Sequence, residues 1–132
     1  MILLPLIQIE LVSATESIPT IALLDSGATL SFIQHEMAEM LDVLSDPNVS
    51  LIDVATAGGT RQFKGVRLSK LSLIAGGRIF SDFSNFPILI PSQQANDLPY
   101  AILGRDSIFK RFHVTFKEKS KKFTLVHHKY AH

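Results

Sequence analysis

The chain contains no cysteine among its 132 residues. Without cysteine it forms no disulfide, carries no thiol nucleophile and offers no cysteine-ligated metal site. It also has no apolar stretch long enough to cross a membrane as a helix. The apolar N-terminus has no basic segment and is interrupted by Pro5, which is unlike a secretory signal peptide. We therefore expect a cytoplasmic protein with no membrane partner.

Basic residues are absent from the first half of the chain. Residues 1–60 contain eight acids and no lysine or arginine, a net charge of −8, whereas residues 61–132 carry a net charge of +9. Such asymmetry can mark a face that binds nucleic acid. In an interleaved β fold, however, the two halves of the chain mix in space. We favour this second interpretation.

Short alternating or apolar runs separated by glycine and polar turns predict a mostly β protein. The expected strands cover residues 6–12, 19–24, 30–33, 49–54, 60–64, 66–73, 78–83, 86–90, 100–103, 113–116 and 122–126. Apolar residues at helical spacing predict one helix over residues 33–44, and residues 107–111 add a short helix. No repeat or linker divides the chain, so we expect one domain over residues 1–132, folded as a barrel or closed sandwich.

Asp25 follows directly on an apolar strand and precedes the small residues Ser26 and Gly27. An ionised carboxylate beside apolar side chains is costly, and small residues let backbone groups approach and hold it. Two carboxylates about 3 Å apart share one proton and hydrolyse a peptide bond without metal or nucleophile. The ionised one takes a proton from water, and the protonated one polarises the carbonyl. Asp25 is therefore a candidate for half of such a pair.

The second carboxylate is not found in the same chain. Asp53, Asp82 and Asp106 all lack the small-residue turn that follows Asp25. A single-copy half-site implies a twofold homodimer, in which Asp25 from each chain meets on the axis. The sequence thus predicts a second copy of this chain as a partner.

Other chemistries find little support. The chain has no Gly-x-Ser-x-Gly elbow and no His-Glu-x-x-His pair, and Gly58-Gly59 lacks the lysine of a phosphate loop. Histidines 127, 128 and 132 could form a weak metal site, but a frayed tail is the favoured interpretation. We expect no metal and no cofactor.

Four stretches follow one another along the chain. They are Leu23-Leu24-Asp25-Ser26-Gly27-Ala28-Thr29, residues 57–65, Ala101-Ile102-Leu103-Gly104-Arg105-Asp106, and residues 113–116. Their order resembles the retropepsins, the retroviral-type aspartic proteases, and is most similar to their cellular and small prokaryotic relatives. In that family the matching parts are the catalytic turn, the flap with its returning strand, the apolar-apolar-Gly element before a short helix, and the strand after that helix. The likeness spans roughly residues 5–127, which implies that these form the core of the domain.

That resemblance implies a small closed acid-protease β-barrel that cleaves peptides as a homodimer. The Asp25 residues of two chains would form the dyad, Ser26 would bond across it to its twin chain, and Gly27 would accept substrate backbone. The segment that closes over an extended peptide would comprise Thr56, Ala57, Gly58, Gly59 and Thr60. The pockets beside the cleaved bond would be lined by Ala28, Ala57 and Ile102, which implies apolar substrate residues there.

The chain departs from the viral pattern at position 29. Thr29 stands where many viral members carry an aspartate that pairs with the arginine matching Arg105, so Arg105 needs another partner. Through the resemblance, Thr29, Gly104, Arg105 and Asp106 are assigned to the framework and the dimer interface. The helix at 33–44 fits the cellular relatives, and the interface is expected at the hairpin over residues 112–126.

Two other functions remain open at this point. One is a retropepsin-like dimer that binds peptide and cleaves it poorly or not at all. The other is a nucleic-acid-binding β-barrel, because cations crowd the C-terminal hairpin between aromatic residues. Those cations are Lys110, Arg111, Lys117, Lys119, Lys121 and Lys122, interleaved with Phe112, Phe116 and Phe123. A solvated hairpin with its phenylalanines in the core is the favoured interpretation.

Overall fold

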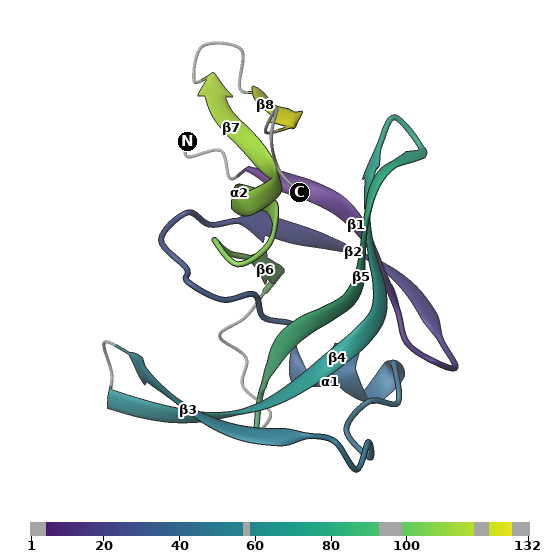
Figure 1. Cartoon of the computed structure of the whole chain (residues 1–132), viewed down its shortest axis with the longest axis vertical. Helices are drawn as coiled ribbons and strands as arrows, with labels where there is room; N and C mark the ends of the chain where they lie inside the picture. The colour runs from purple at the N-terminus through teal and green to yellow at the C-terminus, as the bar shows by residue number, and fades with distance from the viewer. Residues whose placement is uncertain (1–4, 57–58, 93–98, 118–121, 128–132) are drawn as a thin grey trace.

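The computed structural model describes residues 5–56, 59–92, 99–117 and 122–127 and is mostly β, as predicted (Figure 1). Its elements, in chain order, are β1 (Leu6–Val12), β2 (Ser17–Leu24), α1 (His35–Met40), β3 (Ser50–Thr56), β4 (Gly59–Ala75), β5 (Arg78–Pro91), β6 (Ala101–Leu103), α2 (Ile108–Arg111), β7 (Phe112–Lys117) and β8 (Lys122–His127). None of the helices in these ranges combines the length and the apolar character needed to cross a membrane.

The main sheet is organised around the long strand β4. One edge of β4 pairs with β5, while its other edge pairs first with β3 and then, further along, with β1. Strand β1 continues to β2, and β2 pairs in parallel with the short strand β6. Strands β7 and β8 form a separate two-stranded sheet. Because β4 pairs with different partners along its length, the ribbon curls across the molecule (Figure 1).

The predicted closed barrel is not confirmed. Within the described residues the sheet runs from β3 to β6, and these two end strands do not pair with each other. The expected strand at 30–33 is wrong, because only Phe32 makes bridges there. Phe32 bridges Leu89 of β5 on one side and Ile102 of β6 on the other. In the described part of the chain, Phe32 alone therefore links β5 to β6, which a full strand at 30–33 would have joined into one continuous sheet.

The predicted helix at 33–44 is shorter in the structure. It covers only His35–Met40 and ends before Asp42, whose φ of 58° is a left-handed conformation outside helical geometry. Ile33 and Leu41 are fully buried but lie outside the helix, whereas Met40, which lies inside it, is 58% exposed. The helical periodicity of the sequence therefore mixed residues of the helix with residues of the flanking turns. The predicted turn at 119–121 lies outside the described residues.

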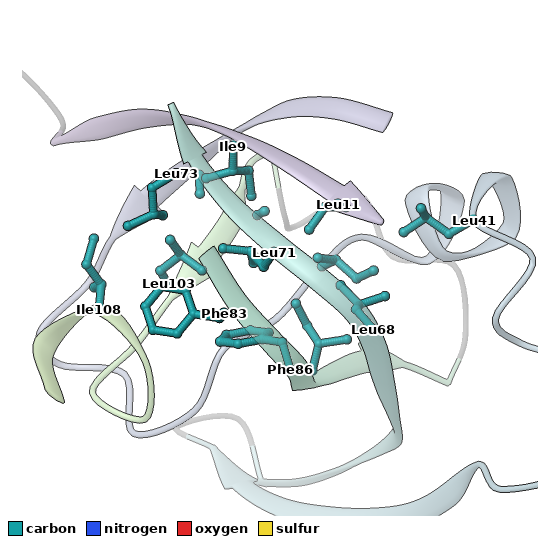
Figure 2. Close-up of a cluster of buried hydrophobic side chains, with 14 of the residues drawn as sticks. Ile9, Leu11, Leu41, Leu68, Leu71, Leu73, Phe83, Phe86, Leu103 and Ile108 are labelled. Carbon is teal, nitrogen blue, oxygen red and sulfur yellow. The ribbon is translucent and has the colours of Figure 1, made fainter. Parts of the chain in front are cut away.

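The core lies inside the curl of the sheet. Figure 2 shows buried side chains from β1, β4, β5, β6 and α2 gathered in this core, with Leu41, which follows α1, at its edge. Phe112 at the start of β7 is 2% exposed and belongs to this core, so its ring is not available to stack on bases. Leu24 and Leu103 are also buried in it. Because these two residues end β2 and β6, the core fixes the point from which Asp25 and Gly104 emerge.

Candidate active site

Asp25 leaves the sheet at the end of the parallel pair β2–β6. Leu24 lies opposite Leu103 in the register of these strands. The Leu24 amide donates to the Pro5 carbonyl at 2.9 Å, and the Asp25 amide donates to the Leu103 carbonyl at 3.0 Å. The main chain is thus held on both sides up to the acid itself. The apolar strand before Asp25 is what buries this anchor.

A tight turn over residues 25–28 holds the Asp25 carboxylate. The Gly27 amide donates to Asp25 Oδ1 at 2.9 Å, and the Ala28 amide donates to the Asp25 carbonyl at 3.1 Å. A Cβ at Gly27 would lie 3.2 Å from the same Oδ1, so a side chain there would crowd the carboxylate. The acid is half-buried, while Ser26 and Gly27 are exposed. We call residues 25–28 the Asp25 turn.

The segment after this turn is docked on residues 104–107. The Arg105 amide donates to the Ala28 carbonyl at 2.8 Å, and the Gly104 amide donates to Ser31 Oγ at 3.0 Å. A Cβ on Gly104 would lie only 2.4 Å from the Leu30 carbonyl oxygen and 2.6 Å from that of Ala28. Glycine at 104 therefore permits the close approach of the two segments.

Two buried serines, Ser31 and Ser107, complete this junction and were not among the predicted site residues. The Ser31 hydroxyl donates to Asp106 Oδ1 at 2.7 Å and lies 3.1 Å from the Ser107 hydroxyl. The Ser31 amide donates to Asp106 Oδ2 at 3.3 Å, and the Ser107 hydroxyl donates to the Gly104 carbonyl at 3.1 Å. The signal was the position of Ser31 inside the apolar run 30–33, because a buried hydroxyl needs polar partners.

The structure brings Arg105 to Thr29. Arg105 Nη2 donates to Thr29 Oγ1 at 3.0 Å, so the threonine hydroxyl is the partner that the sequence left unidentified. Both residues are exposed. Asp106 does not pair with this arginine, since its carboxylate accepts bonds from Ser31 instead. The four residues assigned to the framework thus meet at one junction.

The β3–β4 hairpin carries the predicted flap. Thr56 pairs with Gly59, which has a φ of 109°, and Gly59 and Thr60 are exposed; Ala57 and Gly58 lie outside the described residues. In Figure 1 this hairpin and the loop after β2 project toward the same side of the view. The Phe32 ring lies 5.2 Å from the Phe63 ring of β4, centroid to centroid. This contact joins the segment after the Asp25 turn to the base of the hairpin.

The remaining predicted site residues are distributed around β6. Ala28 closes the Asp25 turn, and Ile102 pairs with Leu23 and bridges to Phe32. The side chains of Ala28 and Ile102 are both half-buried. The Ser26 hydroxyl has no hydrogen-bond partner within the described part of the chain. A cavity of about 560 Å³ lies elsewhere and contains none of the predicted site residues. Its lining comprises Gln8, Ile9, Pro19, Thr20, Ile21, Ile74, Pro99 and Tyr100.

The part of the chain that the structure describes contains no cluster of side chains that could bind a metal ion. No three histidine, aspartate or glutamate side chains in these ranges gather closely enough to hold an ion. His128 and His132 lie outside the described residues. What the geometry offers is a single carboxylate, held by the Gly27 amide in a turn that faces solvent on one side.

Comparison with known proteins agrees with this arrangement. No curated protein matches the chain. The family of gag-polyprotein putative aspartyl proteases matches residues 14–109. The matched range includes β2, the Asp25 turn, the β3–β4 hairpin and the Gly104 junction. Since the match covers most of the sequence, the chain belongs to the gag-polyprotein putative aspartyl protease family, a retropepsin-like group.

Proposed function

We propose that this chain is an aspartic endopeptidase that works as a homodimer. The observation that carries the proposal is the Asp25 turn. It emerges from a buried parallel strand pair and fixes one carboxylate oxygen by the Gly27 amide at 2.9 Å. Membership of an aspartyl protease family supports the same chemistry. The active unit comprises residues 5–127 of each copy, folded as one domain.

Two Asp25 carboxylates, one from each copy, share a single proton in this mechanism. The ionised carboxylate removes a proton from a water molecule, and the oxygen of that water attacks the peptide carbonyl carbon. The protonated carboxylate donates its proton to the carbonyl oxygen. The tetrahedral intermediate collapses when the carboxyl group that took the water proton passes it to the amide nitrogen and the C–N bond breaks. A hydroxyl of the intermediate gives its proton to the other carboxylate, which regenerates the singly protonated pair.

The exposed residues of the turn contact the second copy and the substrate. The Ser26 hydroxyl bonds to the twin chain across the dyad, and the Gly27 carbonyl accepts a bond from the substrate backbone. The β3–β4 hairpin closes over an extended peptide through residues 56–60, which excludes water and orients the cleaved bond. Ala28 and Ile102, with Ala57 of the hairpin tip, line pockets for apolar residues beside that bond.

The experiment replaces Asp25 with asparagine and measures cleavage of a diverse peptide library by mass spectrometry. Asp25→Asn removes the group that activates water, so turnover should fall at least about a thousandfold. The fold and the dimer should persist, because the asparagine side-chain oxygen still accepts the Gly27 amide bond. Circular dichroism and sedimentation measure these two properties.

Asp42→Asn is the matched control. It makes the same chemical change at an exposed acid whose φ of 58° suits asparagine, so the cleavage rate should match that of the unmodified chain. Normal cleavage by Asp25→Asn would refute the dyad. Binding of a statine-type transition-state mimic by an unmodified chain that cuts no peptide would favour the non-cleaving peptide-binding dimer.

A further inference from the structure

Arg105 is held beside the Asp25 turn at two points, once through its main-chain amide and once through its guanidinium. The Arg105 amide donates to the Ala28 carbonyl at 2.8 Å, and its Nη2 donates to Thr29 Oγ1 at 3.0 Å. Gly104 holds the preceding main chain in contact with the carbonyls of Leu30 and Ala28. An exposed arginine usually loses considerable side-chain freedom when it binds a ligand. Here part of that ordering is already present in the free chain.

The charge of Arg105 is not compensated within the described residues. No carboxylate in these ranges lies within 4.0 Å of its guanidinium, and Thr29 supplies only a neutral hydroxyl. The adjacent Asp106 turns inward, where Ser31 donates to both of its oxygens. The remaining N–H groups of the exposed guanidinium are therefore available to an acceptor from outside the chain.

We propose that Arg105 binds a carboxylate of the substrate and makes the enzyme prefer peptides with an aspartate or glutamate near the cleaved bond. The planar guanidinium presents paired N–H groups that match a carboxylate. This inference rests on the proposed protease function and specifies its substrate class. The preferred substrate would then carry an acidic residue near the cleaved bond in addition to the apolar residues that fill the pockets beside it.

The position of the acid follows from the chain geometry. Thr29 is four residues from Asp25, so the two Cα atoms lie at most about 14 Å apart, and the turn shortens that span. An extended peptide advances about 3.3 Å per residue. The acidic side chain therefore lies within about four residues of the cleaved bond. In the proposed twofold dimer one Arg105 lies on each side, so acids are preferred at symmetric positions before and after the cut.

The test uses pairs of peptides that are identical except for glutamate or glutamine at one position. This position is scanned over about four residues on each side of a cleavage site identified with the peptide library. The unmodified chain should cleave the glutamate peptide with a kcat/KM about threefold to tenfold higher at one symmetric pair of positions. The ratio should shrink as salt is raised, because the pair is exposed. Arg105→Gln should bring the ratio to about one, and Arg105→Lys should retain part of it.

Arg78→Gln is the matched control, because Arg78 is exposed at the turn between β4 and β5, and it should leave the ratio unchanged. Cleavage without any glutamate preference, or a preference that survives Arg105→Gln, would overturn the inference and leave the protease intact. Loss of dimerisation in Arg105→Gln, with no preference in the unmodified chain, would show that a carboxylate of the second copy occupies Arg105. Absence of all cleavage would refute the protease function. Fluorescence anisotropy of the same peptides, carrying a fluorescent label, would then still test whether Arg105 makes the chain bind the glutamate peptide more tightly.

Discussion

Gly104 is the residue on which the geometry around Asp25 depends most. Its hypothetical Cβ would meet backbone atoms, the carbonyl oxygens of Leu30 and Ala28 at 2.4 and 2.6 Å. Backbone atoms cannot rotate away as the end of a side chain can. The neighbouring amide of Arg105 bonds to the same Ala28 carbonyl, and Ala28 closes the Asp25 turn. A side chain at position 104 would therefore displace the turn that holds the Asp25 carboxylate.

We predict that Gly104→Ala lowers the free energy of unfolding by about 1–3 kcal/mol, because the two packed segments must separate. Activity of the folded fraction should fall as well, since the Asp25 turn moves with Ala28. Chemical denaturation measures the first effect, and kcat/KM on a cleaved peptide measures the second.

Gly65→Ala is the matched control for this change. At Gly65 the close contact, 2.8 Å, is with the Cδ1 atom at the end of the Ile52 side chain, which can rotate away. Its cost in stability should be smaller than that of Gly104→Ala. An equal or larger loss at Gly65 would show that crowding at the 104 junction is not the dominant constraint.

At the scale of residues, the sequence predicted what is local. Asp25, Ser26, Gly27 and Ala28 are contiguous, so their turn could be recognised without knowledge of the fold. The contacts of Ser31 with Asp106 and Ser107 span 75 and 76 residues and depend on the pairing of β2 with β6. A lone serine in an apolar run predicts only that it needs a partner, not which residue supplies it.

Phe63 packs the β3–β4 hairpin against the segment that follows the Asp25 turn. This residue pairs with Ile52 in β3 and with Pro91 in β5, and its ring contacts Phe32 beyond the Asp25 turn. Its side chain is only 5% exposed. The base of the proposed flap thus packs against the segment after the Asp25 turn through this ring contact.

Phe63→Ala should therefore lower the free energy of unfolding by about 3–5 kcal/mol, the usual cost of removing a buried phenylalanine. It should also raise the KM for peptide more than it lowers kcat, because a loosened hairpin closes less well over substrate. Denaturant unfolding and steady-state kinetics measure the two effects.

Phe80→Ala makes the same change in β5, where the ring is 39% exposed and contacts Phe112 with 6.1 Å between centroids. Less apolar area is lost there, so its cost should be smaller and its KM unchanged. If KM rises equally in both variants, the packing of Phe63 is not what allows the hairpin to close over substrate.

At the scale of elements, the sequence predicted the existence of strands better than their extent. Glycine at 65 and the polar stretch before Phe86 predicted breaks, yet β4 and β5 run through both positions. Gly65 keeps its pairing with Ser50 and Leu89, and Asn85 adopts a φ of 50° within β5. Paired neighbouring strands hold such residues in line, and that support is not visible in a single segment. The helix was overestimated because buried residues flank it on both sides.

At the scale of the whole molecule, the order of strands was the least predictable feature. The parallel pairing of β2 with β6 joins residues about eighty positions apart, and nothing in either short run specifies the other. The chain presents a single Asp25 turn, half-buried and open to solvent on one side. In the proposed dimer a second copy of the chain completes the site, and mixing two variants of the chain tests this.

Mixing the unmodified chain with Asp25→Asn tests whether one active site needs two chains. In random exchange at equal amounts, half of the unmodified chains enter mixed dimers that hold one aspartate and one asparagine. These mixed dimers cannot share a proton between two carboxylates, so total activity should fall to about half after exchange. Adding the same amount of Asp42→Asn instead should raise the activity, because this variant keeps Asp25. The formation of mixed dimers is checked by capturing an affinity-tagged Asp25→Asn chain and detecting the unmodified chain bound to it. Activity that stays constant as Asp25→Asn is added, under conditions where such mixed dimers are recovered, would mean that one Asp25 is sufficient for cleavage.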